Sequence, residues 1–196
     1  YVGSAPLSGL KTGLNKAFII DDHRRDELCR EHPSARELIV PLLRGQDVER
    51  WWSPISGQNI ILLKSSSNNQ WPWSECSDEL EAEAVFQTSF PSIFRHMKAL
   101  ESWRDPSSGK LRGLRHREDK GRFWWELRSN AYYDVFEHGY VAYQDIAYHS
   151  AFEIKTGIVP EMTAFCIPKN DNLLLASLNS PVCWHYMSRN MLHGKD

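Results

Sequence analysis

Basic side chains gather between residues 104 and 128, where eight Lys or Arg stand against four acidic residues. Trp103, Phe123, Trp124 and Trp125 are interleaved with these cations. Cations neutralise phosphates and flat rings stack on bases, so the combination is typical of a nucleic-acid surface. A solvated loop that keeps the chain from aggregating is the alternative interpretation. The candidate contact residues in this segment are Lys110, Arg112, Arg115, Arg117, Lys120 and Arg122.

A shorter polar segment, "KTGLNK" at residues 11–16, runs directly into the apolar residues "AFII". Its lysines can contact phosphates, and its Thr and Asn can form hydrogen bonds, on a stem that the apolar residues would anchor. A tight turn with exposed lysines is the alternative, since Gly and Asn are turn residues. The candidates here are Lys11, Thr12, Asn15 and Lys16.

The stretch "LLRGQDVERW" at residues 42–51 contains another cation that can reach a ligand. Arg44 can contact a phosphate or the O6/N7 edge of guanine. It can equally cap carbonyls at the end of a helix, and Asp47 can pair with Arg44 or with Arg50. We expect a structural role for Asp47 and Arg50, and a contact role for Arg44 and Gln46.

One group of residues is loosely like a nuclease centre. Asp145 precedes Glu153 and Lys155 in "QDIAYHSAFEIK", and such carboxylates with a lysine can hold Mg²⁺ and activate water. The pattern is short and common by chance, so a metal-dependent nuclease is only an alternative. The four cysteines and eight histidines show no metal-ligand spacing, which predicts free thiols in a reducing compartment and no metal site.

The elements that position these residues form a mixed set. The apolar patterns predict strands at 17–21, 59–64, 140–148, 151–157 and 162–168, and helices at 23–31, 35–43, 79–103 (interrupted at Pro91), 172–179 and 182–191. Gly45 is expected to end the 35–43 helix, and Asp171 and Ser180 to cap the last two. Because strands and helices do not alternate as βαβ units, the sequence predicts an α+β fold.

Several apolar side chains are expected to form the core. Trp124 and Trp125 are predicted to lie in the core and at its rim, and the C-terminal Leu173, Leu174, Leu178, Val182 and Trp184 in the core. The net charge of −2 gives no overall attraction to nucleic acid or membrane, so any such role depends on local charge. No apolar run approaches the ~20 residues that span a bilayer. The chain starts at Tyr1, and we expect it to be part of a longer protein.

Six segments in order, "GLKTGLNKAFIID", "SARELIVPLLRGQDVERW", "FWWELR", "YVAYQDIA", "TAFCIP" and "LLLASLNSPVCWHYM", resemble a known family. The chain resembles the TaqI-like C-terminal specificity domain of N6-adenine DNA methyltransferases, which also occurs in fused type IIG (IIS) restriction–modification enzymes and phage-defence methyltransferases. The resemblance covers nearly the whole chain, so residues 1–196 are expected to form one mixed target-recognition domain with short sheets, large loops and a C-terminal helical segment.

The resemblance implies that the chain grips duplex DNA and reads a short sequence while another domain methylates adenine. An N-terminal methyltransferase domain of the same polypeptide would bind S-adenosylmethionine and, with a fused nuclease, Mg²⁺; this fragment would hold no cofactor and no catalytic residue. Tyr143 and Gln144 stand where relatives commonly show Tyr-Pro, and the Gln144 amide can read adenine. The implied setting is the prokaryotic cytoplasm, with no membrane partner. The remaining alternative is a protein-interaction module of a defence complex, using the acidic stretch 75–83.

Overall fold

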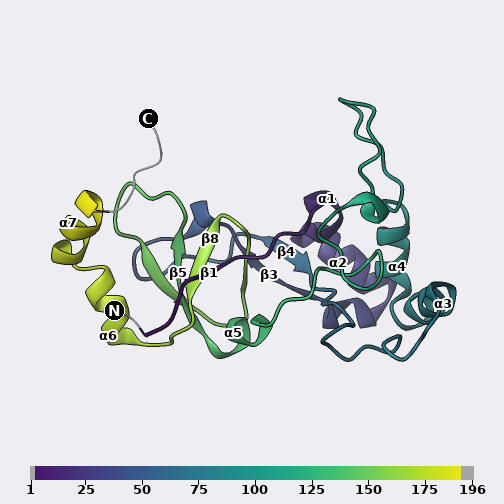
Figure 1. Cartoon of the computed structure of the whole chain (residues 1–196), viewed down its shortest axis with the longest axis horizontal. Helices are drawn as coiled ribbons and strands as arrows, with labels where there is room; N and C mark the ends of the chain where they lie inside the picture. The colour runs from purple at the N-terminus through teal and green to yellow at the C-terminus, as the bar shows by residue number, and fades with distance from the viewer. Residues whose placement is uncertain (1–2, 191–196) are drawn as a thin grey trace. The chain divides into compact units, whose positions relative to one another are not determined.

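The computed structural model describes residues 3–190, and these divide into two compact units (Figure 1). Among the described residues, unit 1 contains 3–10, 41–56 and 132–190, and unit 2 contains 11–40 and 57–131. Both units combine helices with short strands, which confirms the α+β class. Within the described part of the chain, no helix is long and apolar enough to cross a membrane.

Unit 1 is built on a four-stranded antiparallel sheet in the order β1-β8-β5-β6. The strands are β1 (Leu7–Ser8), β5 (Tyr140–Gln144), β6 (Phe152–Lys155) and β8 (Ala164–Ile167). Ala142 at the centre of β5 lies opposite Glu153 on one side and Cys166 on the other. The three longer strands lie inside the predicted ranges, because their apolar residues are buried against the rest of unit 1.

Helices follow the last strand of this sheet. They are α6 (Asn172–Leu178) and α7 (Pro181–Asn190), and α5 (Tyr133–His138) precedes β5. Asp171 accepts hydrogen bonds from the first turn of α6, and Ser180 accepts one from the Cys183 backbone, as predicted. The core prediction was wrong for two residues of this region, since Leu173 is 77 % exposed and Val182 80 % exposed. Leucine spacing alone does not tell which face of a helix meets the sheet.

Unit 2 pairs β2 (Ile19–Asp21) antiparallel with β4 (Gln58–Ile61). Its helices are α1 (Asn15–Phe18), α2 (Asp22–Glu31), α3 (Glu79–Ser89) and α4 (Pro91–Lys98), and its 3-10 turns are η1 (Pro33–Glu37) and η3 (Leu114–His116). The predicted interruption at Pro91 is confirmed, because this proline begins α4 rather than continuing α3. Buried aromatic rings form much of the core, and Trp125 stacks on Phe123 and on Phe86.

The predicted helix at 35–43 is wrong in its second half. After η1 the chain extends into β3 (Ile39–Leu43), whose last residues pair in parallel with β7 (Val159–Pro160) of unit 1. Pro41 lacks the amide hydrogen that a helix needs, and Ile39 and Val40 are β-branched, so strand formation wins. Gly45 therefore caps no helix but starts the 3-10 turn η2 (Gly45–Asp47).

Candidate nucleic-acid interface

The polar loop 11–16 lies against the basic segment in unit 2. The Lys11 ammonium pairs with Asp119 at 3.0 Å, and the Lys16 Nζ lies 4.9 Å from the centre of the Trp103 ring. Thr12 is buried and donates its hydroxyl hydrogen to Asn15 Oδ1 at 2.6 Å. The structure thus brings together two segments that the sequence places almost a hundred residues apart.

Gly13 allows this close approach. Its φ of +69° is in the left-handed region, and a Cβ atom there would lie 3.3 Å from the Cβ atoms of Arg117 and Asp119. The turn interpretation of the loop is therefore correct in its geometry. Both interpretations hold together, since the turn leaves Lys11 and Lys16 exposed on the surface of unit 2.

Arg117, a predicted contact residue, is instead part of the core of unit 2. Only 6 % of it is exposed, and its guanidinium donates to the backbone carbonyls of Thr12, Asp119, Trp124 and Glu126. Its charge also lies 4.6 Å from the ring centre of Phe18. The planar fork of donors suits this role, in which one side chain holds loop 11–16 and the segment 119–126 together.

Two more predicted contact residues are engaged inside unit 2. Arg115 pairs with Glu79 at 2.6 Å and Glu101 at 2.7 Å, and these contacts raise its pKa against the opposing effect of burial. Arg122 donates to the carbonyls of Ser74 and Cys76 while stacking on Phe123. Both side chains hold segments of unit 2 in place and offer little unpaired charge.

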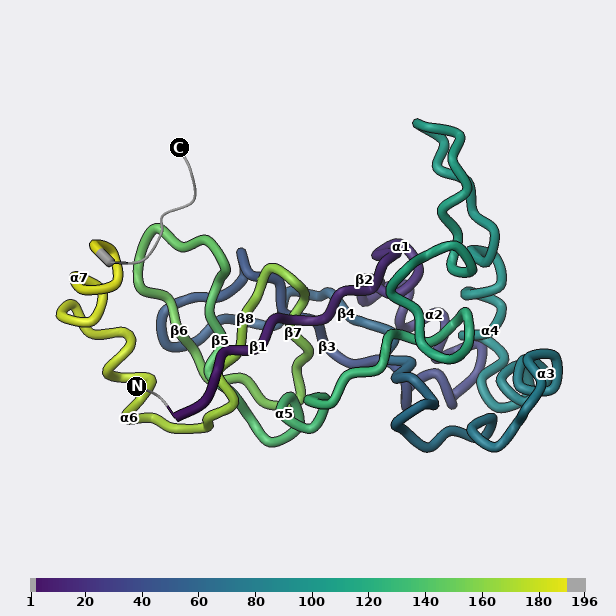
Figure 2. Tube along the Cα trace, in the orientation of Figure 1, coloured from purple at the N-terminus to yellow at the C-terminus, as the bar shows by residue number. Residues whose placement is uncertain are grey.

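Accessible positive charge is left mainly on the segment 103–112 and beside it. Lys110 and Arg112 are exposed, and within residues 3–190 neither forms an ion pair. Lys120 is also exposed and donates to the carbonyl of Arg115 at 3.1 Å. Segment 103–112 is a hairpin that extends beyond α4 in Figure 2, where it is the teal projection. The sequence suggested a loop without regular structure here, and missed the contact between Trp103 and Lys16.

In unit 1 a second group of predicted residues meets at one end of the sheet. The backbone N–H of Gly45 donates to Thr163 Oγ1 at 2.9 Å, and the N–H of Asp145 donates to the Thr163 carbonyl at 3.1 Å. A Cβ atom on Gly45 would lie 2.1 Å from that carbonyl oxygen, so only glycine fits. These contacts bring the turn with exposed Gln46 next to the end of β5, where Gln144 is partly exposed.

Asp47 holds Arg44 in place. The Arg44 guanidinium donates two hydrogen bonds to the Asp47 carboxylate at 2.8 Å and 3.0 Å, and this interaction raises the Arg44 pKa. The structural role predicted for Asp47 is confirmed, and Arg50 donates to the Ser150 carbonyl instead. Arg44 remains partly exposed, with its planar fork in a fixed orientation.

Tyr143 belongs to the core rather than to the surface group. Its ring lies 5.5 Å from Phe152 and 5.7 Å from Phe165, and burial raises its pKa to about 12. It packs against the hydrophobic cluster that includes Val141. Successive strand residues point to opposite faces, so the burial of Tyr143 turns Gln144 the other way.

The nuclease-like residues do not form an open metal site. Glu153 is fully buried, accepts a hydrogen bond from Ser53 at 2.7 Å and pairs with Lys155 at 3.0 Å. Lys155 also donates to the Ser53 carbonyl, while Asp145 is exposed beyond the end of β5. No cluster of three or more potential metal ligands occurs in the residues that the structure describes. The pair instead neutralises two charges beneath the Trp51 segment.

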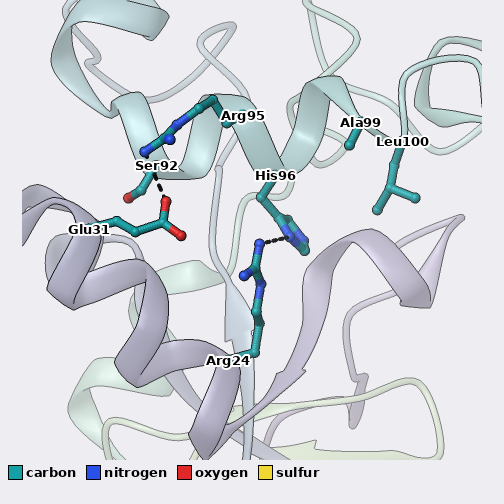
Figure 3. A pocket seen from close by; sticks show the side chains of 7 residues that line it. All are labelled: Arg24, Glu31, Ser92, Arg95, His96, Ala99 and Leu100. Carbon is teal, nitrogen blue, oxygen red and sulfur yellow. Dashed lines mark hydrogen bonds and ion pairs between the residues drawn. The ribbon is translucent and has the colours of Figure 1, made fainter.

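A pocket of about 350 Å³ lies elsewhere in unit 2, between α2 and α4 (Figure 3). Arg95 pairs with Glu31 at 2.9 Å across it, and Arg24 approaches the His96 ring nitrogen at 3.4 Å. His96 also contacts the Ala17 carbonyl at 2.9 Å through its other nitrogen. Because these groups satisfy each other, the pocket connects the helices and offers little to a ligand.

The fold has a counterpart among solved structures. The structure of the type IIL restriction–modification enzyme MmeI in complex with DNA matches this chain with a TM-score of 0.52 and 12 % sequence identity. The match covers 91 % of this chain and 21 % of the MmeI chain. No protein-family model matches the sequence, and a search of curated proteins finds no match. The fold of this chain is therefore similar to that of part of a restriction–modification enzyme.

Proposed function

We propose that this chain recognises a short sequence in duplex DNA on behalf of a restriction–modification enzyme. The observation that carries the proposal is the similarity over 91 % of the chain to an enzyme whose structure was solved in complex with DNA. The ordered segments that resemble TaqI-like specificity domains support the same function. The two groups of side chains described above have the required chemistry, because cations hold phosphates and amides read base edges.

Each group supplies a different part of this chemistry. In unit 2, Lys16, Lys110, Arg112 and Lys120 offer positive charge to phosphates. In unit 1, Arg44 is held in a fixed orientation that suits the guanine edge, and Gln46 and Gln144 offer amides that suit adenine. In this proposal the chemistry belongs to another domain: an N-terminal methyltransferase domain, working in the prokaryotic cytoplasm, would bind S-adenosylmethionine and modify adenine.

Quantitative binding to duplexes tests the proposal. Selection from a random 30-base-pair pool should enrich one short sequence, bound at least a thousandfold more tightly than unrelated duplex. The logarithm of the binding constant should fall by about 0.9 per phosphate contact for each unit of log salt concentration. Both the 196-residue chain and the longer protein that contains it should be measured. If neither shows salt-dependent duplex binding, the proposal is wrong, and salt-insensitive binding to a protein partner would favour the interaction-module alternative.

A further inference from the structure

The hairpin 103–112 is a defined two-stranded ribbon. Arg104 and Leu111 form an antiparallel bridge, flanked by backbone hydrogen bonds from Asp105 to Lys110 at 2.9 Å and from Arg112 to Trp103 at 2.9 Å. The tip is closed by a bond from the Gly109 N–H to the Asp105 carbonyl at 2.7 Å. The ribbon therefore has a fixed register, which determines which side chains share a face.

The tip is also held by side chains. The Asp105 carboxylate accepts hydrogen bonds from the hydroxyls of Ser108 and Ser107 and from the Ser107 backbone, and these bonds lower its pKa to about 2. At its base the hairpin is anchored to α4. The Leu114 N–H donates to the Leu100 carbonyl, and a Cβ atom on Gly113 would lie 2.3 Å from the Glu101 carbonyl oxygen.

The register places the cations in a row. Residues directly opposite in an antiparallel pair point to the same face, so Trp103, Asp105, Lys110 and Arg112 share one face of the ribbon. Lys16 lies over the Trp103 ring, which adds a third cation at the base of that face. Successive same-face residues are about 6.8 Å apart. Positive charge therefore runs from the tip at Lys110, through Arg112, to Lys16, with the one acid of the face engaged by the tip serines.

We propose that this face of the hairpin enters the major groove of duplex DNA, an inference that rests on the proposed function. The major groove, about 12 Å wide and about 8.5 Å deep, admits a two-stranded ribbon, whereas the minor groove is only about 6 Å wide. The arm from Trp103 to the tip is about 13 Å long at 3.3 Å per residue, which exceeds the groove depth. Lys110 then reaches the base edges while Lys16 stays at the level of the phosphates.

A pair of matched double variants tests the inference. Lys110→Ala/Arg112→Ala removes two exposed cations from the hairpin, and Arg30→Ala/Arg36→Ala removes two exposed cations from α2 and η1 of the same unit. The probe is a labelled 30-base-pair duplex carrying the sequence enriched from the random pool. We expect the hairpin variant to bind at least tenfold more weakly at 0.15 M salt and its salt slope to shrink by about 1.8, two contacts at 0.9 each. The control variant should bind like the unaltered chain.

Dimethyl sulfate then identifies the groove, because it methylates guanine N7 in the major groove and adenine N3 in the minor groove. The unaltered chain and the control should protect guanine N7 positions that the hairpin variant leaves reactive. Hairpin-dependent protection at adenine N3, or a hairpin variant that binds like the control, overturns the inference while the proposed function stands. Absence of salt-dependent duplex binding by the unaltered chain and the longer protein refutes both. Equal urea midpoints for the two variants show that folding is unchanged.

Discussion

Replacing Arg117 separates a structural arginine from a DNA contact. Among the basic residues between 104 and 128 it is buried, and its guanidinium supplies hydrogen bonds to four backbone carbonyls. Arg117→Ala leaves those acceptors without these donors. A buried acceptor that loses its partner costs about 1–3 kcal/mol, so even the lower value gives a loss of about 4 kcal/mol in the free energy of unfolding.

The assay is urea denaturation followed by tryptophan fluorescence. Trp73, Trp124 and Trp125 are buried in unit 2 and report on its unfolding. With a urea m-value of about 2 kcal/mol/M, a loss of 4 kcal/mol lowers the unfolding midpoint by about 2 M. Arg117→Lys should recover less than half of the loss, because an ammonium has three donors and cannot copy the planar fork.

The comparison variant is Arg112→Ala, which removes an exposed arginine five residues away. It should leave the urea midpoint within about 0.3 M and reduce the salt slope of DNA binding by about 0.9. The reasoning would be refuted by the reverse result for Arg117→Ala: an unchanged midpoint together with a reduced salt slope. Such a result would mean that Arg117 faces DNA and not the backbone carbonyls.

Three further predictions concern the buried polar groups. Lys155→Met should destabilise unit 1 by about 3–5 kcal/mol because Glu153 keeps its buried charge, whereas Glu153→Gln/Lys155→Met should cost much less; amide hydrogen exchange of β6 measures both. Gly45→Ala should destabilise unit 1 by more than 2 kcal/mol in the same assay, since its Cβ meets the Thr163 carbonyl, and Gly157→Ala, with open space around it, should cost less despite its positive φ. Burial lowers the pKa of His96 below 6.5, so the unfolded state binds more protons and the stability of unit 2 should fall as the pH drops below 6.5; urea midpoints of the unaltered chain should show this fall, and those of His96→Gln should not.

Local patterns were sufficient for the elements whose signals are local. Proline at the start of α4, aspartate before α6 and the apolar runs of β4 and β5 act within a few residues of themselves, so the predicted positions were close to the observed ones. The exchange of a predicted helix for β3 has the opposite cause. Leu42 and Leu43 suit either structure, and only pairing with β7, more than a hundred residues away, decides between them.

The sequence by itself determined that the chain is an α+β protein and that its basic residues are concentrated between 104 and 128 beside aromatic rings. Only the tertiary structure decided which of these cations are accessible. Arg117 and Arg112 look equivalent in the sequence, yet one is buried against four carbonyls and the other lies exposed on a hairpin. The physical reason is that residue type fixes what a side chain can donate, whereas its partners come from segments that folding brings together.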